Sequence, residues 1–143
     1  MDEFWSYVGK KSNQRWTWYA LDKSSGIIVA WHNGTRADED FLHLLNYLES
    51  MPIDLYYTDA WGAYSRNLSE QKHIIGKAHT WKIERKNLNF RTHIKRLTRK
   101  TIWFSKSQIV HDTGIGMYSA RYYFKHGSFS QSASTIHTNR FKT

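Results

Sequence analysis

Three acidic residues stand at places in this chain of 143 residues where carboxylates could do chemistry. Asp2 precedes the first apolar and aromatic segment, and Asp59 directly follows another, Ile53 to Thr58. If both segments are neighbouring strands, the two carboxylates converge at one edge, where α/β sheets place their sites. Carboxylates so close repel each other unless a cation bridges them, and oxygen ligands favour Mg²⁺ or Mn²⁺.

Glu84 is the third candidate. It lies in a basic segment that is expected to be helical, and Asn87 and Arg91 follow at i+3 and i+7 on the same face. A carboxylate, an amide and a guanidinium would then face one cleft. A structural alternative stays open, because an Asp at a strand end is more often a turn or cap residue, and a Glu among cations more often an ion-pair partner. The pattern alone favours this alternative.

The elements that would position these acids begin with a three-stranded meander. Its strands are expected at Phe4 to Val8, Arg15 to Ala20 and Ile27 to Trp31, which are rich in aromatic and β-branched residues. Turn residues separate them, Gly9 to Asn13 in the first connection and Lys23 to Gly26 in the second.

A helix and a returning strand follow the meander. Apolar residues recur at intervals of three and four from Asp38 to Ser50, which predicts an amphipathic helix that Pro52 closes. The segment Ile53 to Thr58 then returns to the sheet as a strand, in parallel. A short helix is expected at Trp61 to Leu68 and a fifth strand at His73 to Ile75, so the order of elements is βββαβαβ.

The C-terminal half is expected to be helical. Thr80 to Lys100 contains no Gly or Pro and predicts a long basic helix, and Ser105 to Phe124 predicts a last helix, interrupted or bent near Gly114 and Gly116. Gly, Ser, Thr and Asn dominate beyond Lys125, so a poorly ordered tail is expected over residues 125–143. Residues 1–124 should form a single domain.

Composition narrows the possible partners. Twenty-one Lys and Arg residues against 12 Asp and Glu give a net charge of +9, at which nucleic-acid phosphates become plausible partners, although membranes and acidic proteins also bind basic surfaces. The chain has no cysteine, no signal peptide and no long apolar run. We therefore expect a soluble cytoplasmic protein without disulfides or a thiolate zinc site.

Several segments in fixed order resemble the insertion sequence 1 family of bacterial transposases, in particular its InsB-like catalytic part. The resemblance covers Met1 to about Tyr123. It rests on Asp2-Glu3 with Trp5 and Tyr7-Val8-Gly9, on Tyr57-Thr58-Asp59-Ala60-Trp61 with Tyr64, on Ile83-Glu84-Arg85 with Asn87-Leu88-Asn89 and Arg91, on Leu97 with Arg99-Lys100, and on Phe104-Ser105-Lys106-Ser107.

The resemblance implies a ribonuclease-H-like α/β fold, with a mixed five-stranded sheet flanked by helices, and a catalytic metal triad of Asp2, Asp59 and Glu84 that binds two Mg²⁺ or Mn²⁺ ions. It also implies a nucleoid-associated bacterial protein that assembles as a homo-oligomer on transposon ends and target DNA. An upstream zinc-binding and helix-turn-helix part would be joined by frameshift. In such folds the first Asp lies partway along its strand, whereas only Met1 precedes Asp2 here.

Other residues are candidates for contacts with DNA. Phosphate binding is expected for a basic and amide set that flanks Glu84, although a solvated helix face is the alternative. This set is Lys82, Arg85, Lys86, Asn87, Arg91, Lys95, Arg96, Arg99 and Lys100. Trp61, next to Asp59, is expected beside the site as a base-stacking platform. His79 is also expected beside the site, in a structural or DNA-facing role, because the histidines lack the spacing of metal ligands.

The predicted function is DNA cleavage and strand transfer in transposition. One alternative is a catalytically inactive, truncated remnant that only binds nucleic acid, which would show no metal dependence. Another is a stand-alone ribonuclease-H-like nuclease, which would cleave DNA without joining it.

Overall fold

The first three strands form the predicted antiparallel meander. The computed structural model describes residues 1–76, 81–98, 100 and 102–126. In it, β1 (Asp2–Tyr7), β2 (Gln14–Leu21) and β3 (Ile28–Gly34) pair in sequence order. Asp2 pairs with Tyr19 and Glu3 with Trp18, and paired residues share a face of the sheet. Neighbouring residues alternate between faces, so Asp2 and Glu3 point to opposite sides.

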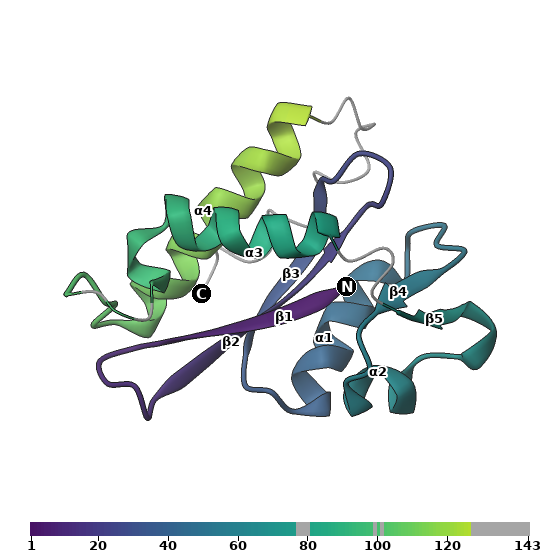
Figure 1. Cartoon of the computed structure of the whole chain (residues 1–143), viewed down its shortest axis with the longest axis horizontal. Helices are drawn as coiled ribbons and strands as arrows, with labels where there is room; N and C mark the ends of the chain where they lie inside the picture. The colour runs from purple at the N-terminus through teal and green to yellow at the C-terminus, as the bar shows by residue number, and fades with distance from the viewer. Residues whose placement is uncertain (77–80, 99, 101, 127–143) are drawn as a thin grey trace.

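Helices cover both faces of this sheet (Figure 1). The helices α1 (Asp38–Leu48) and α2 (Gly62–Asn67) pack on the face of Trp18, where Phe41 and Leu44 are fully buried. The helices α3 (Trp81–His93) and α4 (Gln108–His126) lie on the face of Tyr19. On this face the aromatic rings of Phe4, Tyr19 and Phe90 pack with centroids 5.0 to 6.1 Å apart.

Two further strands form a separate parallel pair. They are β4 (Tyr56–Thr58) and β5 (His73–Ile75), which follows the short 3₁₀ helix η1 (Glu70–Lys72). The predicted order βββαβαβ is confirmed. The expected five-stranded sheet is not formed within the described part of the chain, where β4 and β5 pair apart from the other three strands. β1 meets β4 only at its tip, where the Met1 ammonium donates a hydrogen bond of 2.6 Å to the Tyr57 carbonyl.

The long basic helix expected from Thr80 to Lys100 is wrong in its second half. α3 ends at His93, and a 3₁₀ helix, η3 (Lys95–Leu97), follows it. At Ile94 the backbone leaves helical geometry, with φ −107° and ψ 89°. This break lets Leu97 reach the core, where it is 2% exposed. Burial of an apolar side chain therefore outweighs continuation of a charged helix.

α4 runs without the interruption that was expected near Gly114 and Gly116. Gly116 lies against the Trp31 ring, and helix packing onto β3 outweighs the low helix propensity of the two glycines. Buried polar contacts fix the start of α4. His111 is hydrogen-bonded to Ser6 and Ser105 at 2.8 Å each, and burial lowers the pKa of its imidazole.

The helix α4 ends at His126, two residues beyond the predicted domain boundary at residue 124. Most of the predicted tail, residues 127–143, lies outside the described residues.

Candidate active site

The Asp2 side chain is hydrogen-bonded to the helix α3. The Asn87 side-chain amide donates a hydrogen bond of 2.5 Å to the Asp2 carboxylate, and the Tyr19 hydroxyl lies 2.7 Å from the Asn87 oxygen, to which it donates. Tyr19 is fully buried, and its hydroxyl also lies 3.2 Å from the carbonyl of Ile83. Asn87 was expected to contact DNA, yet its amide is directed into the protein, where it joins β1 to α3.

The surroundings of Asp2 disfavour its negative charge. Burial raises the pKa of the Asp2 carboxyl from its ordinary value of 3.8 to about 6, and the charges of Glu3 and Asp59 add to this rise. The hydrogen bond from Asn87 acts in the opposite direction and is outweighed. A half-buried carboxylate with two like charges nearby is a place where a bound cation would be stabilised.

Asp59 lies at the end of β4, where the chain turns into α2. Its side chain is exposed, and one carboxylate oxygen accepts a hydrogen bond of 2.9 Å from the Trp61 backbone N–H. Beneath it, the buried Thr58 hydroxyl donates to the Asp59 carbonyl at 2.8 Å and contacts His73 at 2.6 Å. The contact between Met1 and Tyr57 therefore brings the strands that carry Asp2 and Asp59 together.

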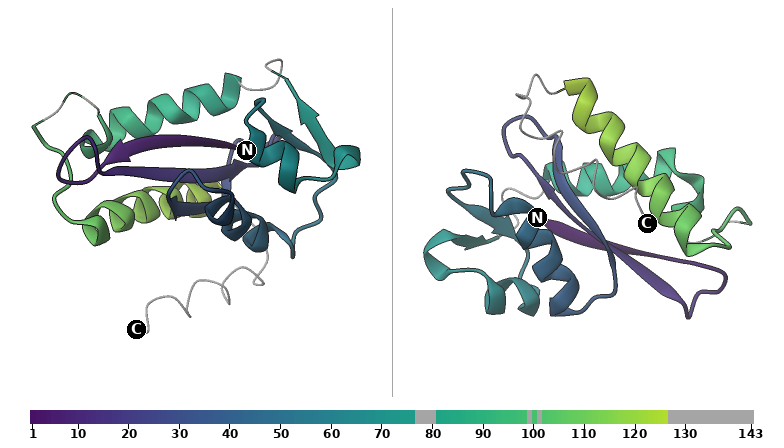
Figure 2. Two further views of the ribbon diagram at one scale, coloured as in Figure 1. Left: turned by 90° about the horizontal axis from the view of Figure 1, so that it is seen from below. Right: turned by 180° about the vertical axis from the view of Figure 1, so that it is seen from behind.

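Glu84 lies in the first turn of α3, one turn before Asn87, and is exposed. Figures 1 and 2 show the start of β1 near the middle of the molecule, beside β4 and the start of α3. Among the residues that the structure describes, no three His, Asp or Glu side chains are close enough to form a group that could hold a metal ion. The structure thus joins the strand of Asp2 to that of Asp59 and to α3, while the Glu84 side chain is exposed to solvent.

Sequence analysis missed a second carboxylate at this end of the sheet. Glu3 is buried, and its two oxygens accept hydrogen bonds from Arg36, at 2.7 and 3.2 Å, and from the Tyr64 hydroxyl, at 2.6 Å. Alternation along β1 was a signal that Glu3 would face away from Asp2. Its partners lie 33 and 61 residues away in sequence, so local spacing gave no sign of them.

The basic set expected to bind phosphates divides into two groups. Arg85, Lys95, Arg96 and Lys100 are exposed. Three others face the protein. Lys86 is 8% exposed, and burial lowers the pKa of its ammonium. Arg91 is half-buried, and the Lys82 ammonium donates hydrogen bonds of 2.6 and 3.2 Å to the carbonyls of Lys23 and Ser24. Arg99 and His79, the latter expected beside the site, lie outside the described residues.

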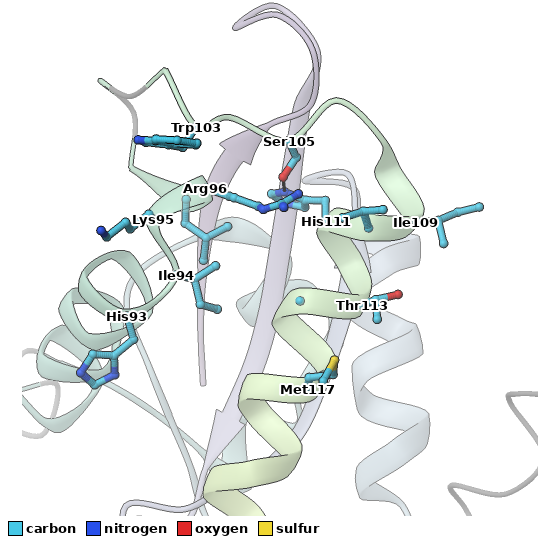
Figure 3. A pocket seen from close by; sticks show the side chains of 13 residues that line it. His93, Ile94, Lys95, Arg96, Trp103, Ser105, Ile109, His111, Thr113 and Met117 are labelled. Atoms are coloured by element: carbon cyan, nitrogen blue, oxygen red, sulfur yellow. Dashed lines mark hydrogen bonds between the residues drawn. The ribbon is translucent and has the colours of Figure 1, made fainter.

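A groove of about 600 Å³ lies elsewhere, between η3 and the first half of α4 (Figure 3). Trp103, Ile109 and Met117 line it and are 66, 79 and 70% exposed. His111 also lines the groove and is hydrogen-bonded to Ser6. Ser6 lies near the C-terminal end of β1, whereas Asp2 is at its N-terminal end. The groove is therefore separate from the acidic residues.

No helix in the described ranges has both the length and the apolar character that a membrane crossing requires.

Comparison with known proteins identifies the class of protein. The IS1 transposase family matches residues 1–125, which is most of the chain. The chain therefore belongs to the IS1 transposase family, as the resemblance in its sequence indicated, and its role is that of a transposase, with DNA as partner.

Curated relatives agree over most of their own length. The insertion element iso-IS1n protein InsB of Shigella dysenteriae is 44% identical over 124 residues, which cover 87% of this chain and 95% of that protein. The insertion element IS1 protein InsB of Shigella flexneri is 44% identical over 118 residues, or 82% of this chain and 90% of that protein. No solved structure matches the chain.

Proposed function

We propose that this chain catalyses metal-dependent DNA cleavage and strand transfer, in a ribonuclease-H-like arrangement of Asp2, Asp59 and Glu84. The observation that supports this most is the hydrogen bond from Asn87 to Asp2. It holds the first turn of α3, with Glu84, over the end of β1 that contacts β4 and Asp59. This contact supports the proposal that three acids from distant parts of the sequence act at one site.

The donor set fits Mg²⁺ or Mn²⁺. The three candidates offer oxygen atoms alone, and a cation between Asp2 and Asp59 would stabilise the Asp2 carboxylate, which burial and, to a lesser extent, the charges of Glu3 and Asp59 destabilise. When bound, two such ions would activate the attacking water or DNA 3′-hydroxyl and stabilise the leaving oxygen. The exposed Glu84 side chain would have to move to join the other two, because no group of three potential metal ligands is present among the described residues.

The remaining residues position the acids and the DNA. Asn87 fixes the orientation of the Asp2 carboxylate, and the Trp61 N–H fixes one oxygen of Asp59. The exposed cations of α3 and η3 would bind backbone phosphates and hold the scissile bond in line with the attacking group. Recognition of transposon ends would require the upstream zinc-binding and helix-turn-helix part, and synapsis of two ends would require a homo-oligomer.

A strand-transfer assay tests the proposed function. The chain, with and without the upstream part, is incubated with labelled duplexes that carry the ends of its own element and with a target plasmid, in Mg²⁺, in Mn²⁺ and in EDTA. Joined products that require a divalent ion are expected. Cleavage without joining would instead indicate a stand-alone nuclease, and binding without either reaction would indicate an inactive remnant.

The divided basic face makes a prediction for DNA affinity. Replacing exposed Arg85 and Lys95 with Gln should make the negative slope of log affinity against log salt concentration shallower by about 0.9 for each phosphate that the protein no longer neutralises. Lys72 on η1 serves as the control, because it is exposed and its ammonium lies 3.3 Å from the Ile53 carbonyl. Lys72→Gln should leave the slope unchanged. Equal slopes in the parent and both variants would mean that these exposed cations of α3 and η3 are merely solvated.

A further inference from the structure

An ion pair with a buried carboxylate lies close to the candidate active site, on the opposite face of β1 from Asp2. The Glu3 side chain is only 2% exposed, and the Arg36 side chain that neutralises it is 37% exposed. The guanidinium makes both of its hydrogen bonds to the same Glu3 oxygen, and the Tyr64 hydroxyl occupies the other. Removing one partner from a buried pair leaves an uncompensated charge, so this contact resists rearrangement.

The same guanidinium lies over two indole rings. Arg36 lies 3.6 Å from the centroid of Trp61 and 4.5 Å from that of Trp16. The buried Trp61 Nε1 has no hydrogen-bond partner among the described residues, so core packing and the stack against Arg36 hold this ring. The stacking energy of a planar guanidinium on an indole is substantial when water is excluded.

Hydrogen bonds connect Trp61 to Asp59 and to Tyr64. The Trp61 backbone N–H donates the hydrogen bond to the Asp59 carboxylate, and the Tyr64 N–H donates to the Trp61 carbonyl at 3.1 Å. Glu3 thus holds the Asp59 turn through Arg36 and through Tyr64. On the opposite face of the same strand, the neighbouring Asp2 is held by Asn87.

We infer that Arg36 is a positioning residue for Asp59, which it holds through Trp61 at a fixed place relative to Asp2. This inference rests on the proposed function. An exposed arginine in a basic DNA-binding protein would ordinarily be assigned to phosphate contact. Here Glu3 already neutralises its charge, and a phosphate could recruit it only by leaving a buried carboxylate unpaired.

The test uses a substitution that keeps the charge. Arg36→Lys retains an ammonium for Glu3 but loses the planar stack and the paired hydrogen bonds. Arg66→Lys is the matched control, because Arg66 also makes two hydrogen bonds to a carboxylate, that of Asp38, without stacking on Trp61. Trp61→Leu is the second variant, since it removes the stack and leaves Glu3 paired with Arg36.

The first measurement is amide exchange by NMR in the metal-free protein. In Arg36→Lys, the Trp61 amide should exchange at least about tenfold faster than in the parent, because the turn opens locally more often. In Arg66→Lys it should not change. An unchanged Trp61 amide in Arg36→Lys overturns the inference, and this result does not depend on whether the protein is a metal enzyme.

The second measurement is Mn²⁺ binding, followed by electron paramagnetic resonance in the presence of DNA. Arg36→Lys and Trp61→Leu should each weaken Mn²⁺ binding by about tenfold, as removal of a group that orients a metal ligand does. The salt dependence of DNA binding should stay the same. Unaltered Mn²⁺ affinity in both variants would overturn the inference while the parent still cleaved DNA. A parent protein that cleaves without metal would instead contradict the proposed function.

Discussion

Replacing Asp2 with Asn is expected to abolish DNA cleavage and strand transfer, and at the same time to make the metal-free protein more stable. The catalytic loss should reach at least about a thousandfold, because metal-assisted stabilisation of transition-state charge contributes several kcal/mol. An Asn at this position still accepts the hydrogen bond from Asn87, so local geometry should survive. Joining of labelled ends to a plasmid measures the loss.

The gain in stability follows from the raised pKa of Asp2. A carboxyl whose pKa rises from 3.8 to about 6 on folding lowers stability as pH increases through this range, because the unfolded chain ionises more easily. At about pH 7.5, Asp2→Asn should therefore be more stable than the parent by about 1 to 3 kcal/mol. The difference should vanish by about pH 3, which is below both pKa values, because Asp2 is then largely protonated in the folded protein and in the unfolded chain alike.

Urea unfolding in EDTA at both pH values measures this difference. Asp54→Asn is the control, because Asp54 is an exposed acid close to β4. It should change neither activity nor stability appreciably. If Asp2→Asn were less stable than the parent at the higher pH, the charge of Asp2 would be compensated by groups other than Asn87.

Truncation of Phe90 to Ala should produce the largest loss of stability on α3. Phe90 is fully buried and its ring contacts those of Phe4, Tyr19 and Tyr118. Loss of a buried phenylalanine costs about 3 to 5 kcal/mol, because a cavity remains where the ring packed. Since α3 also carries Asn87, the variant should lose the hydrogen bond from Asn87 to Asp2 before it unfolds completely.

Leu88→Ala on the same helix is the matched control. Leu88 is 64% exposed, so its truncation should change stability by less than about 0.5 kcal/mol. Unfolding free energies from urea titration distinguish the two variants. A cost below about 1 kcal/mol for Phe90→Ala would mean that α3 is not anchored to the sheet by this ring.

Local patterns predicted most of the elements. The strand His73 to Ile75 was placed correctly, and the helix expected from Asp38 to Ser50 is two residues shorter in the structure. These segments carry regular apolar spacing or sharp boundaries, which depend on neighbours in sequence. The place of β4 against the tip of β1 involves a contact between Met1 and Tyr57, 56 residues apart, and no periodicity encodes it.

The acidic residues of the candidate site could be proposed from the sequence, but the side chains that orient them could not. In a segment with a cation at almost every turn, such as Lys82 to Lys100, charge pattern does not distinguish the buried Lys86 from the exposed Arg85. The inward direction of Asn87 on α3 depends on Tyr19, which lies on β2, 68 residues away in sequence. Side chains that orient a site are selected by three-dimensional complementarity, and sequence spacing records only the part that lies within one element.

The alternation of Asp2 and Glu3 on β1 couples the site to strand register. A slip of one residue between β1 and β2 would exchange the two carboxylates between the faces of the sheet. Asp2 would then face Arg36 and Tyr64, and Glu3 would face Asn87, each with a side chain of the wrong length for its partner. A misaligned meander would thus lose the ion pair behind the site and the carboxylate within it in one step. Correct pairing of the first hairpin during folding is therefore also the event that assembles the site, and partly folded molecules should be unable to cut DNA.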